Sequence, residues 1–425
     1  MNQKGAVIVI VAGSLVAFIG MAALALDLGH LCLVRNELQN AADSGALAGA
    51  RALYVEDGSA VNSGANDRAN EAATSNTADK VTVDINSGDI QRGHWSFGLG
   101  TLPRGFYPND SLVRVDLARP LVELDQDPSF INAMQVRTRR DATKAASFFA
   151  TIFGYTGFRL AAEAVAYIGF AADAGPAEVD EPIAVCRQAI TDVDGGFSCV
   201  TGRMFNSGSN IETHNTSAWT DFSQPCESAT SGNEVRQIID NDQGNTYMIS
   251  LGSMSTTGGN TTGPALFSLM DKWVQVTNKT VVWPMTLPVI DCPGNNTTSC
   301  AEVTGFVRIK VVWINGNNPP WDSVPTTMSD PEGEYSPWSS SLLSDDSSVQ
   351  TVTLSDGFTY QTTPRWDSFV QHFNLKDAGG HPAQFKPTSA GKTIYFVPSC
   401  VYEDLIGNSG GDPFGILAKI PRLVN

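Results

Sequence analysis

The cysteines are the residues of this sequence with the most definite chemistry. There are seven, one just past an apolar N-terminal run and six in the C-terminal region: Cys32, Cys186, Cys199, Cys226, Cys292, Cys300 and Cys400. In an oxidising compartment the six would form disulfides, and six cysteines allow fifteen pairings. We predict one pair, Cys292 with Cys300, because CPGNNTTSC has the composition of a turn with close ends. No C-x-x-C or H-x-x-x-H spacing occurs, which disfavours structural zinc.

Ser409 lies in a Gly-Asn-Ser-Gly-Gly stretch that matches G-x-S-x-G and resembles the nucleophile loop of chymotrypsin-like proteases. A nucleophilic serine needs a base, and in that family the histidine follows Ala-Ala and precedes Cys. No histidine of this chain has that context, and Asp412 replaces the family's usual proline. The histidines are His30, His94, His214, His372 and His381. We therefore predict a glycine-rich turn and no catalytic residue.

Two acidic loops, 192–195 and 240–244, place carboxylates two residues apart before a glycine, as at the start of a calcium loop. Neither has the closing glutamate that a full loop requires, so solvated turns are favoured and we predict no metal or cofactor. The distal tryptophans could form a sugar-binding platform, although core packing is the favoured interpretation. They are Trp219, Trp273, Trp283, Trp313, Trp321, Trp338 and Trp366.

The composition limits the partners. The chain has 425 residues and a formal charge of −17, from 27 basic and 44 acidic residues, which argues against nucleic acid or anionic lipid as the main partner. Only 17% of the residues are charged. Ser, Thr, Asn and Gly recur through the C-terminal half, as in an extracytoplasmic, β-rich protein with long surface loops.

The stretch 5–54 is predicted to form one long helix. Residues 6–26 carry no charge, and at 1.5 Å per residue they make about 31 Å of helix, enough to cross a bilayer. Beyond them, a stripe of residues on one face of the helix continues at spacings of four and three. The side chains at the end of this stripe are small. The stripe is Leu24, Leu28, Leu31, Arg35, Leu38, Ala42, Gly45 and Gly49. We predict a helix that lies half in lipid and half outside.

Lys4 lies on one side of the apolar run and Asp27 on the other, which favours a cytoplasmic N-terminus. Two alternatives involve cleavage. Ala23-Leu24-Ala25 fits a secretory signal cleavage site, although the stripe continues through it. Cleavage of a prepilin after Gly5 is disfavoured because Ile10 stands where that enzyme expects glutamate.

After the helix we predict a domain at 55–175 and a β-rich, disulfide-containing domain at 176–425. The first contains a polar helix within 61–80, strands at 81–85, 90–97, 112–117 and 160–170, and a short helix at 142–153. The second contains strands at 246–251, 280–283, 303–314, 349–354 and 393–397. Of these, 303–314 alternates as a strand with one buried face. A proline-rich stretch, 317–348, is expected to be a mobile insertion. The fold class is α+β.

The opening sequence is similar to that of the TadE/TadG-like family of tight-adherence (Flp) pilus assembly proteins. The family's signature is Asp-Leu-Gly, then Leu-Gln-Asn-Ala-Ala-Asp, then Ala-Leu-Ala-Gly-Ala, and it matches residues 27–29, 38–43 and 46–50. A looser likeness continues to about residue 170. Some members carry an adhesive domain whose metal site needs D-x-S-x-S, and this chain has no such motif.

The resemblance implies a structural role, as a minor pilin-like component of a tight-adherence pilus with other pilus proteins as partners. The expected location is a single pass through the inner membrane, with the C-terminal domains periplasmic or extracellular. Gly13 and Gly20 would suit a partner helix, whereas Gly45 and Gly49 more simply fit the helix against its own domain. The alternatives are a tethered adhesin or ligand-binding module and, third, a secreted hydrolase.

Overall fold

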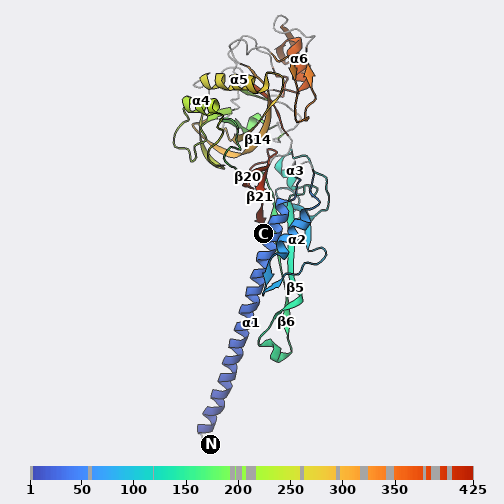
Figure 1. The fold of residues 1–425 in the computed structure, drawn as a ribbon, viewed down its shortest axis with the longest axis vertical. Helices are drawn as coiled ribbons and strands as arrows, with labels where there is room; N and C mark the ends of the chain where they lie inside the picture. Colours follow the sequence, from blue (N-terminus) through green and yellow to red (C-terminus); the bar gives the residue numbers. More distant parts are fainter. Residues whose placement is uncertain are drawn as a thin grey trace.

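A single helix, α1 (Gln3–Arg51), runs along the axis of the elongated molecule. In Figure 1 its N-terminal half projects alone, its C-terminal half packs in a first domain, and a distal domain lies beyond. The computed structural model describes residues 3–55, 60–117, 119–191, 197, 203–206, 217–258, 263–292, 297–315, 324–340, 349–376, 380–383, 393–399 and 404–424. The predicted long helix and the α+β class are confirmed.

The first domain is built on an antiparallel five-stranded sheet against which α1 packs. Its strand order is β22-β6-β5-β3-β4. The bounds are β3 (Ile90–Ser96), β4 (Gly105–Pro108), β5 (Ala133–Ala146), β6 (Gly157–Tyr167) and β22 (Arg422–Val424). The last strand comes from the end of the chain, where Leu423 pairs with Ala166. The C-terminal segment thus returns from the distal domain to complete the first sheet.

Small residues let α1 lie close to α2 (Ala65–Thr74). Ala65, Ala69 and Ala73 recur every fourth residue, and all three are buried on one face of α2. A Cβ added at Gly45 would lie 2.9 Å from the Cβ of Ala73, and one at Gly49 would lie 2.7 Å from Cγ of Met134 on β5. The simpler interpretation of these two glycines, packing within the domain, is therefore confirmed.

The buried face of α1 differs in part from the predicted stripe. Leu38, Ala42, Gly45 and Gly49 are buried, whereas Leu24, Leu28 and Arg35 are exposed and Leu31 is half-buried. The first domain covers only the C-terminal half of the helix. The face that it covers begins at Asp27 and continues through Val34 and Ala41.

Two predictions in the first domain are wrong. Residues 112–117 form no strand: Leu112 and Val113 are exposed, and none of the strands in the described part of the chain pairs with this segment. The predicted helix at 142–153 is instead the end of β5, a turn and a short 3-10 helix, η1 (Ala150–Phe153). The remaining short elements are β1 (Thr77–Ala78), β2 (Val81–Thr82) and α3 (Leu121–Asp125).

The distal domain is a seven-stranded sheet with the order β12-β10-β8-β13-β14-β19-β9. Because β12 also pairs with β14, the strands β12, β10, β8, β13 and β14 close into a ring. The bounds are β8 (Ile183–Cys186), β9 (Arg203–Asn206), β10 (Ser217–Thr220), β12 (Gly252–Thr257), β13 (Trp283–Ile290), β14 (Cys300–Asn315) and β19 (Thr393–Pro398). All pairings are antiparallel except β8 with β13.

Three helices of the distal domain were not predicted. They are α4 (Gly232–Asn241), α5 (Gly263–Thr277) and α6 (Pro364–His372). The starts of two of them carry recognisable signals: Ser231 and Glu234 form a capping box on α4, and Thr363 caps α6 with a proline at its first position. The smaller elements are β7 (Asp173–Ala174), η2 (Arg187–Ala189), β11 (Ile249–Ser250), β15 (Thr327–Met328), β16 (Trp338–Ser339), β17 (Gln350–Thr353), β18 (Thr359–Thr362), β20 (Asp404–Asn408) and β21 (Leu417–Ile420).

The predicted disulfide between Cys292 and Cys300 is wrong. Cys186 bonds to Cys292 and Cys226 bonds to Cys300, each pair with a Cα–Cα distance of 5.6 Å. The sheet sets both pairings. Cys186 on β8 lies beside the end of β13, close to Cys292. Cys226 lies beside β12, and β12 pairs with the start of β14, which carries Cys300. Cys32 is free and exposed. Cys199 and Cys400 lie outside the described residues.

The tryptophans of the distal domain form its core. Trp273, Trp313 and Trp366 are essentially fully buried, and Trp219, Trp283 and Trp338 nearly so. Trp313 stacks on Tyr395 at 5.1 Å, and Trp366 lies against both rings. Core packing therefore accounts for these six residues, and Trp321 lies outside the described part of the chain.

Candidate functional site

Asp27, the first charged residue after the apolar run, fastens the far end of the first domain to α1. Its carboxylate accepts a hydrogen bond of 2.7 Å from the Ser147 hydroxyl. It also accepts bonds from the backbone N–H groups of Phe148 (2.8 Å), Phe149 (3.1 Å) and Ala150 (2.8 Å). Asp27 is buried, and these donors satisfy a charge that would otherwise be costly to bury. The hairpin of β5 and β6 is thereby tied to the helix at its turn.

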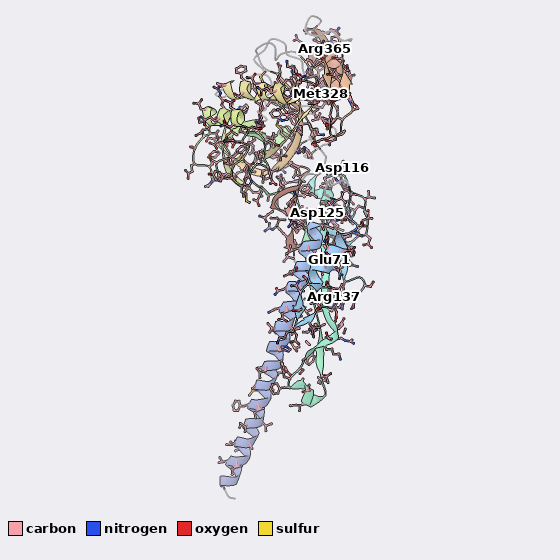
Figure 2. The ribbon with its side chains drawn as sticks, in the orientation of Figure 1. Glu71, Asp116, Asp125, Arg137, Met328 and Arg365 are labelled. Atoms are coloured by element: carbon pink, nitrogen blue, oxygen red, sulfur yellow. A yellow bond between two sulfur atoms is a disulfide. The ribbon has the colours of Figure 1, made fainter. Side chains whose placement is uncertain are left out.

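On the N-terminal side of Asp27, the described side chains of α1 are almost all exposed. Ile10–Arg51 is, among the described residues, the one helix long and apolar enough to cross a membrane, with a mean hydropathy of 2.1 in its most apolar stretch. Figure 2 shows the side chains of its N-terminal half projecting with no neighbours. A Cβ added at Gly13 or Gly20 would meet nothing within 4 Å. Apolar side chains exposed in this way fit membrane association, and Asp27 marks where the apolar segment ends.

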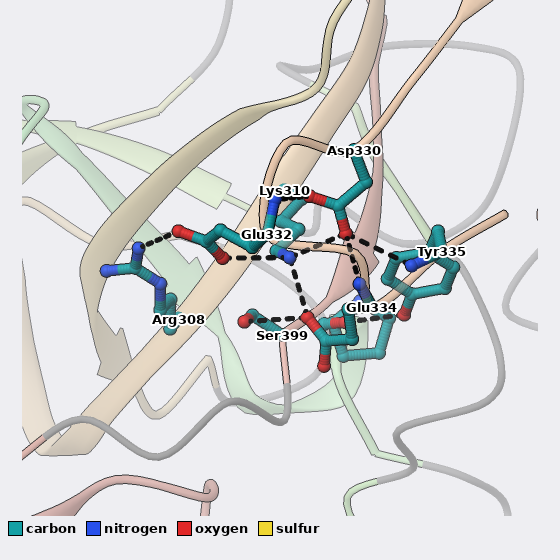
Figure 3. Close-up of polar contacts among 8 residues, drawn as sticks. Arg308, Lys310, Asp330, Glu332, Glu334, Tyr335 and Ser399 are labelled. Carbon is teal, nitrogen blue, oxygen red and sulfur yellow. Dashed lines mark hydrogen bonds and ion pairs between the residues drawn. The ribbon is translucent and has the colours of Figure 1, made fainter. Parts of the chain in front are cut away.

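A second cluster of charged residues surrounds Lys310 in the distal domain (Figure 3). Lys310 lies on β14 with no exposed side-chain surface, and its amine is 2.8 Å from carboxylate oxygens of each of Asp330, Glu332 and Glu334. These acids alternate along the proline-rich stretch. The predicted one-sided burial of 303–314 is therefore wrong, because the face that carries Lys310 is buried too. The described part of the stretch, 324–340, packs on β14 through this cluster.

The electrostatics of this cluster favour its charged form. Burial opposes the charge on Lys310, but hydrogen bonds to the three carboxylates outweigh it and raise the pKa of the amine. Burial would likewise raise the pKa of Asp330, yet Lys310 and backbone amides hold it below its usual value. Asp330 accepts from the amides of Glu332 and Tyr335. Such a network fastens a loop to a strand, and we assign it a structural role.

A third polar group lies in an open hollow of about 270 Å³ beside α4 and α5. The Lys272 amine is 2.5 Å from carboxylate oxygens of both Glu181 and Asp242. Glu181 is almost fully buried, and its second oxygen has no hydrogen-bond partner among the described residues. Burial raises the pKa of Glu181 to about 7, although Lys272 opposes the shift. The Lys272 ammonium thus lies between the two carboxyl groups.

An apolar groove of about 260 Å³ lies where the first domain faces the distal domain. Its lining includes Phe97, Leu121, Tyr167 and Gly410. Asp125, labelled in Figure 2, lies on its wall, but the carboxylate already accepts bonds from Ser96, Phe97 and Leu99. The groove therefore offers apolar surface and little free polar chemistry.

In the structure, the Ser409 hydroxyl bonds to two backbone groups. Its hydroxyl donates to the carbonyl of Ile420 at 3.0 Å and accepts from the amide of Gly169 at 2.9 Å. It is fully buried, and both partners are backbone groups. Ser409 thus joins the returning C-terminal segment to the chain leaving β6.

Of the two acidic loops, 192–195 lies outside the described residues. In 240–244, Asp240 pairs with Arg236 at 3.2 Å, and Asp242 ends α4 in a left-handed conformation beside Lys272. Within the described ranges, no group of three or more His, Cys, Asp or Glu side chains is arranged to hold a metal ion. Asp242 is held by an amine of the protein itself.

Sequence reasoning missed the two clusters that hold segments together. The lone lysine in the apolar run GFVRIKVVWI and the alternating acids of DPEGEY were the available signals for the Lys310 cluster. For Asp27, the available signal was Ser147 ahead of a short helical turn, because a serine hydroxyl there can accept from a backbone amide, as it does from Ala150. The carboxylate that also binds this turn lies 120 residues away on α1 and has no local signal.

Comparison with known proteins supplies family matches over the N-terminal part alone. Residues 5–52, which include most of α1, match a family described as putative Flp pilus-assembly TadE/G-like. Residues 48–166, from the end of α1 through most of β6, match a family described as putative Tad-like Flp pilus-assembly. No curated protein and no solved structure matches the chain. Together with the apolar helix, the two matches support a Tad-like pilus-assembly protein, and they cover residues 5–166 of the chain.

Proposed function

We propose that the protein is a minor pilin-like component of a tight-adherence (Flp) pilus, held in the inner membrane by α1. The observation that carries the proposal is the coincidence of the two family matches with α1 and the sheet that packs on it. The N-terminus would be cytoplasmic and both domains would be periplasmic or extracellular. Disulfides such as Cys186 to Cys292 support that placement, because they persist in oxidising compartments.

The proposed role is structural and not enzymatic. Association would use the bare half of α1 inside the membrane and the surfaces of the two domains outside it. Gly13 and Gly20 support packing by α1, since they lie seven residues apart and have open space around them. We propose that the boundary between the first and the distal domain lies at residue 175. The C-terminal strand β22 belongs to the sheet of the first domain.

The experiment is purification of the intact protein from cross-linked native membranes, followed by identification of the proteins recovered with it. We expect other pilus components. Gly20→Leu should reduce their recovery by blocking close helix approach, whereas Ala22→Leu, about 200° around the helix, should not. Recovery of no pilus component by the wild-type protein would contradict the proposal and favour a tethered adhesin.

A further inference from the structure

The turn between β5 and β6 carries large apolar side chains that the described part of the chain leaves mostly exposed. Phe148 is 61% exposed, Ile152 77% and Tyr155 60%. They lie within eight residues of one another around η1, and Tyr155 stacks on Phe158 at 6.2 Å. A soluble domain rarely presents such a group at one end, because contact with water is unfavourable for each of these side chains.

The position of this turn is fixed relative to the apolar half of α1. Asp27 accepts hydrogen bonds from the backbone amides of Phe148 and Ala150, and the ring of Phe148 lies 5.0 Å from that of His30. Asp27 directly follows the uncharged segment 6–26. The turn therefore lies at the level where that segment ends, and Figure 1 shows the hairpin reaching down beside α1 to this level.

The composition of the hairpin matches the boundary of a bilayer. Trp and Tyr are enriched at that depth because their rings are amphipathic, and Tyr155 belongs to this class. Just above them on the two strands, Lys144 and Arg159 are exposed and lie where anionic headgroups would be. The order along the hairpin is thus apolar at the tip and basic behind it.

We propose that the turn 148–155 inserts into the interfacial layer of the bilayer that α1 crosses. Lipid is the occupant that the structure favours, because the exposed turn continues the exposed apolar surface of α1 at one level. Two contacts with the membrane would fix both the depth of α1 and the direction in which the domains face. The inference concerns lipid contact alone and does not depend on the role in a pilus.

The test uses the full chain in phosphatidylcholine vesicles, with and without phosphatidylglycerol. A spin label is attached at position 152 through Ile152→Cys in a Cys32→Ser background, because Cys32 is free. Val113→Cys is the matched control, since Val113 is 73% exposed against 77% for Ile152. It lies near the far end of α1, where the Val61 amide donates to the Leu112 carbonyl. Collision of each label with oxygen and with a water-soluble nickel chelate is then measured.

We expect the label at position 152 to collide mainly with oxygen and the label at 113 mainly with the nickel chelate. The oxygen preference at 152 should be several times that at 113, in both kinds of vesicle. Equal preferences at the two positions would overturn the proposal. So would shielding of position 152 from both reagents together with spin–spin broadening between copies, because that result would assign the turn to a second protein molecule.

Discussion

The hydroxyl of Ser147 donates a 2.7 Å hydrogen bond to the carboxylate of Asp27, across 120 residues of sequence. This bond joins the turn of the hairpin to the point where the apolar half of α1 ends. Together with the amide donors of the same turn, it makes the first domain and the helix one unit at that level. Asp27 therefore holds the turn of the hairpin at this level of α1, whereas α2, β5 and β6 pack on the helix further along.

Asp27→Ala should release the turn. The variant removes the acceptor of charge-assisted bonds from Phe148 and Ala150. We expect amide hydrogen exchange at 148–150 to accelerate by about ten- to a hundredfold, because the turn then opens more often. Asp43→Ala is the control, because Asp43 accepts from the Gln39 side chain on the same helix. Unchanged exchange in Asp27→Ala would show that other contacts hold the turn.

Gly45→Ala should weaken the packing of α1 on its domain. The added Cβ would lie 2.9 Å from the Cβ of Ala73 and 3.0 Å from the carbonyl of Ala69. Overpacking of this kind costs about 1–3 kcal/mol, measured by denaturant unfolding of the solubilised protein. Gly29→Ala is the matched control, because a Cβ there meets nothing within 4 Å and alanine favours the helix. Equal stability of the two variants would contradict the close approach of α1 and α2.

The long helix and the apolar strand β14 were predictable because each pattern is local and strongly periodic. The stretch 5–54 gave α1 within a few residues, and 303–314 gave most of β14. By contrast, β5 has the sequence AMQVRTRRDATKAA, in which many charged residues hide the alternation typical of a strand. In the structure it pairs with β3 on one side and β6 on the other. Its pairing, and not its composition, makes it a strand.

The partners of charged and sulfur-bearing residues were not predictable, because the fold sets them over long separations. Cys186 meets Cys292 across 106 residues, a pairing that depends on β8 lying parallel to β13. Nearness in sequence favoured Cys300 as the partner of Cys292 and led to the wrong pair. The acids around Lys310 show the same limitation, since their pattern is visible but their target strand is not.

Lys310→Met should destabilise the distal domain strongly. It would leave Asp330, Glu332 and Glu334 facing one another without the cation that all three contact. Removing one partner of a buried ion pair costs about 3–5 kcal/mol. Arg236→Met, which breaks an exposed pair with Asp240, should cost about 0.5 kcal/mol or less. Urea unfolding followed by tryptophan fluorescence measures both, and a small loss in Lys310→Met would show that the cluster contributes little.

The buried carboxyl of Glu181 should make stability depend on pH. Its pKa is raised by burial from 4.5 to about 7, so the folded protein holds this proton more tightly than the unfolded chain. The proton on Glu181 therefore contributes its full share to the free energy of unfolding below pH 4.5, and this share is lost as the pH rises through 7. The loss is up to about 3 kcal/mol.

Glu181→Gln should abolish this part of the pH dependence. The free energies of unfolding of the wild type and of this variant should therefore converge or cross between pH 4.5 and 8. Glu227→Gln, at an exposed position, is the control and should follow the wild type at every pH. A constant difference between the wild type and Glu181→Gln would mean that Lys272 keeps the carboxyl charged throughout.

If the protein is a component of a tight-adherence pilus, the number of pili on the cell should depend on it. Electron microscopy would compare cells of the native host that lack the protein with the same cells carrying the wild-type chain. We expect few or no tight-adherence pili without the protein and restored pili with it. Normal numbers of pili of normal length in the absence of the protein would contradict the proposed role.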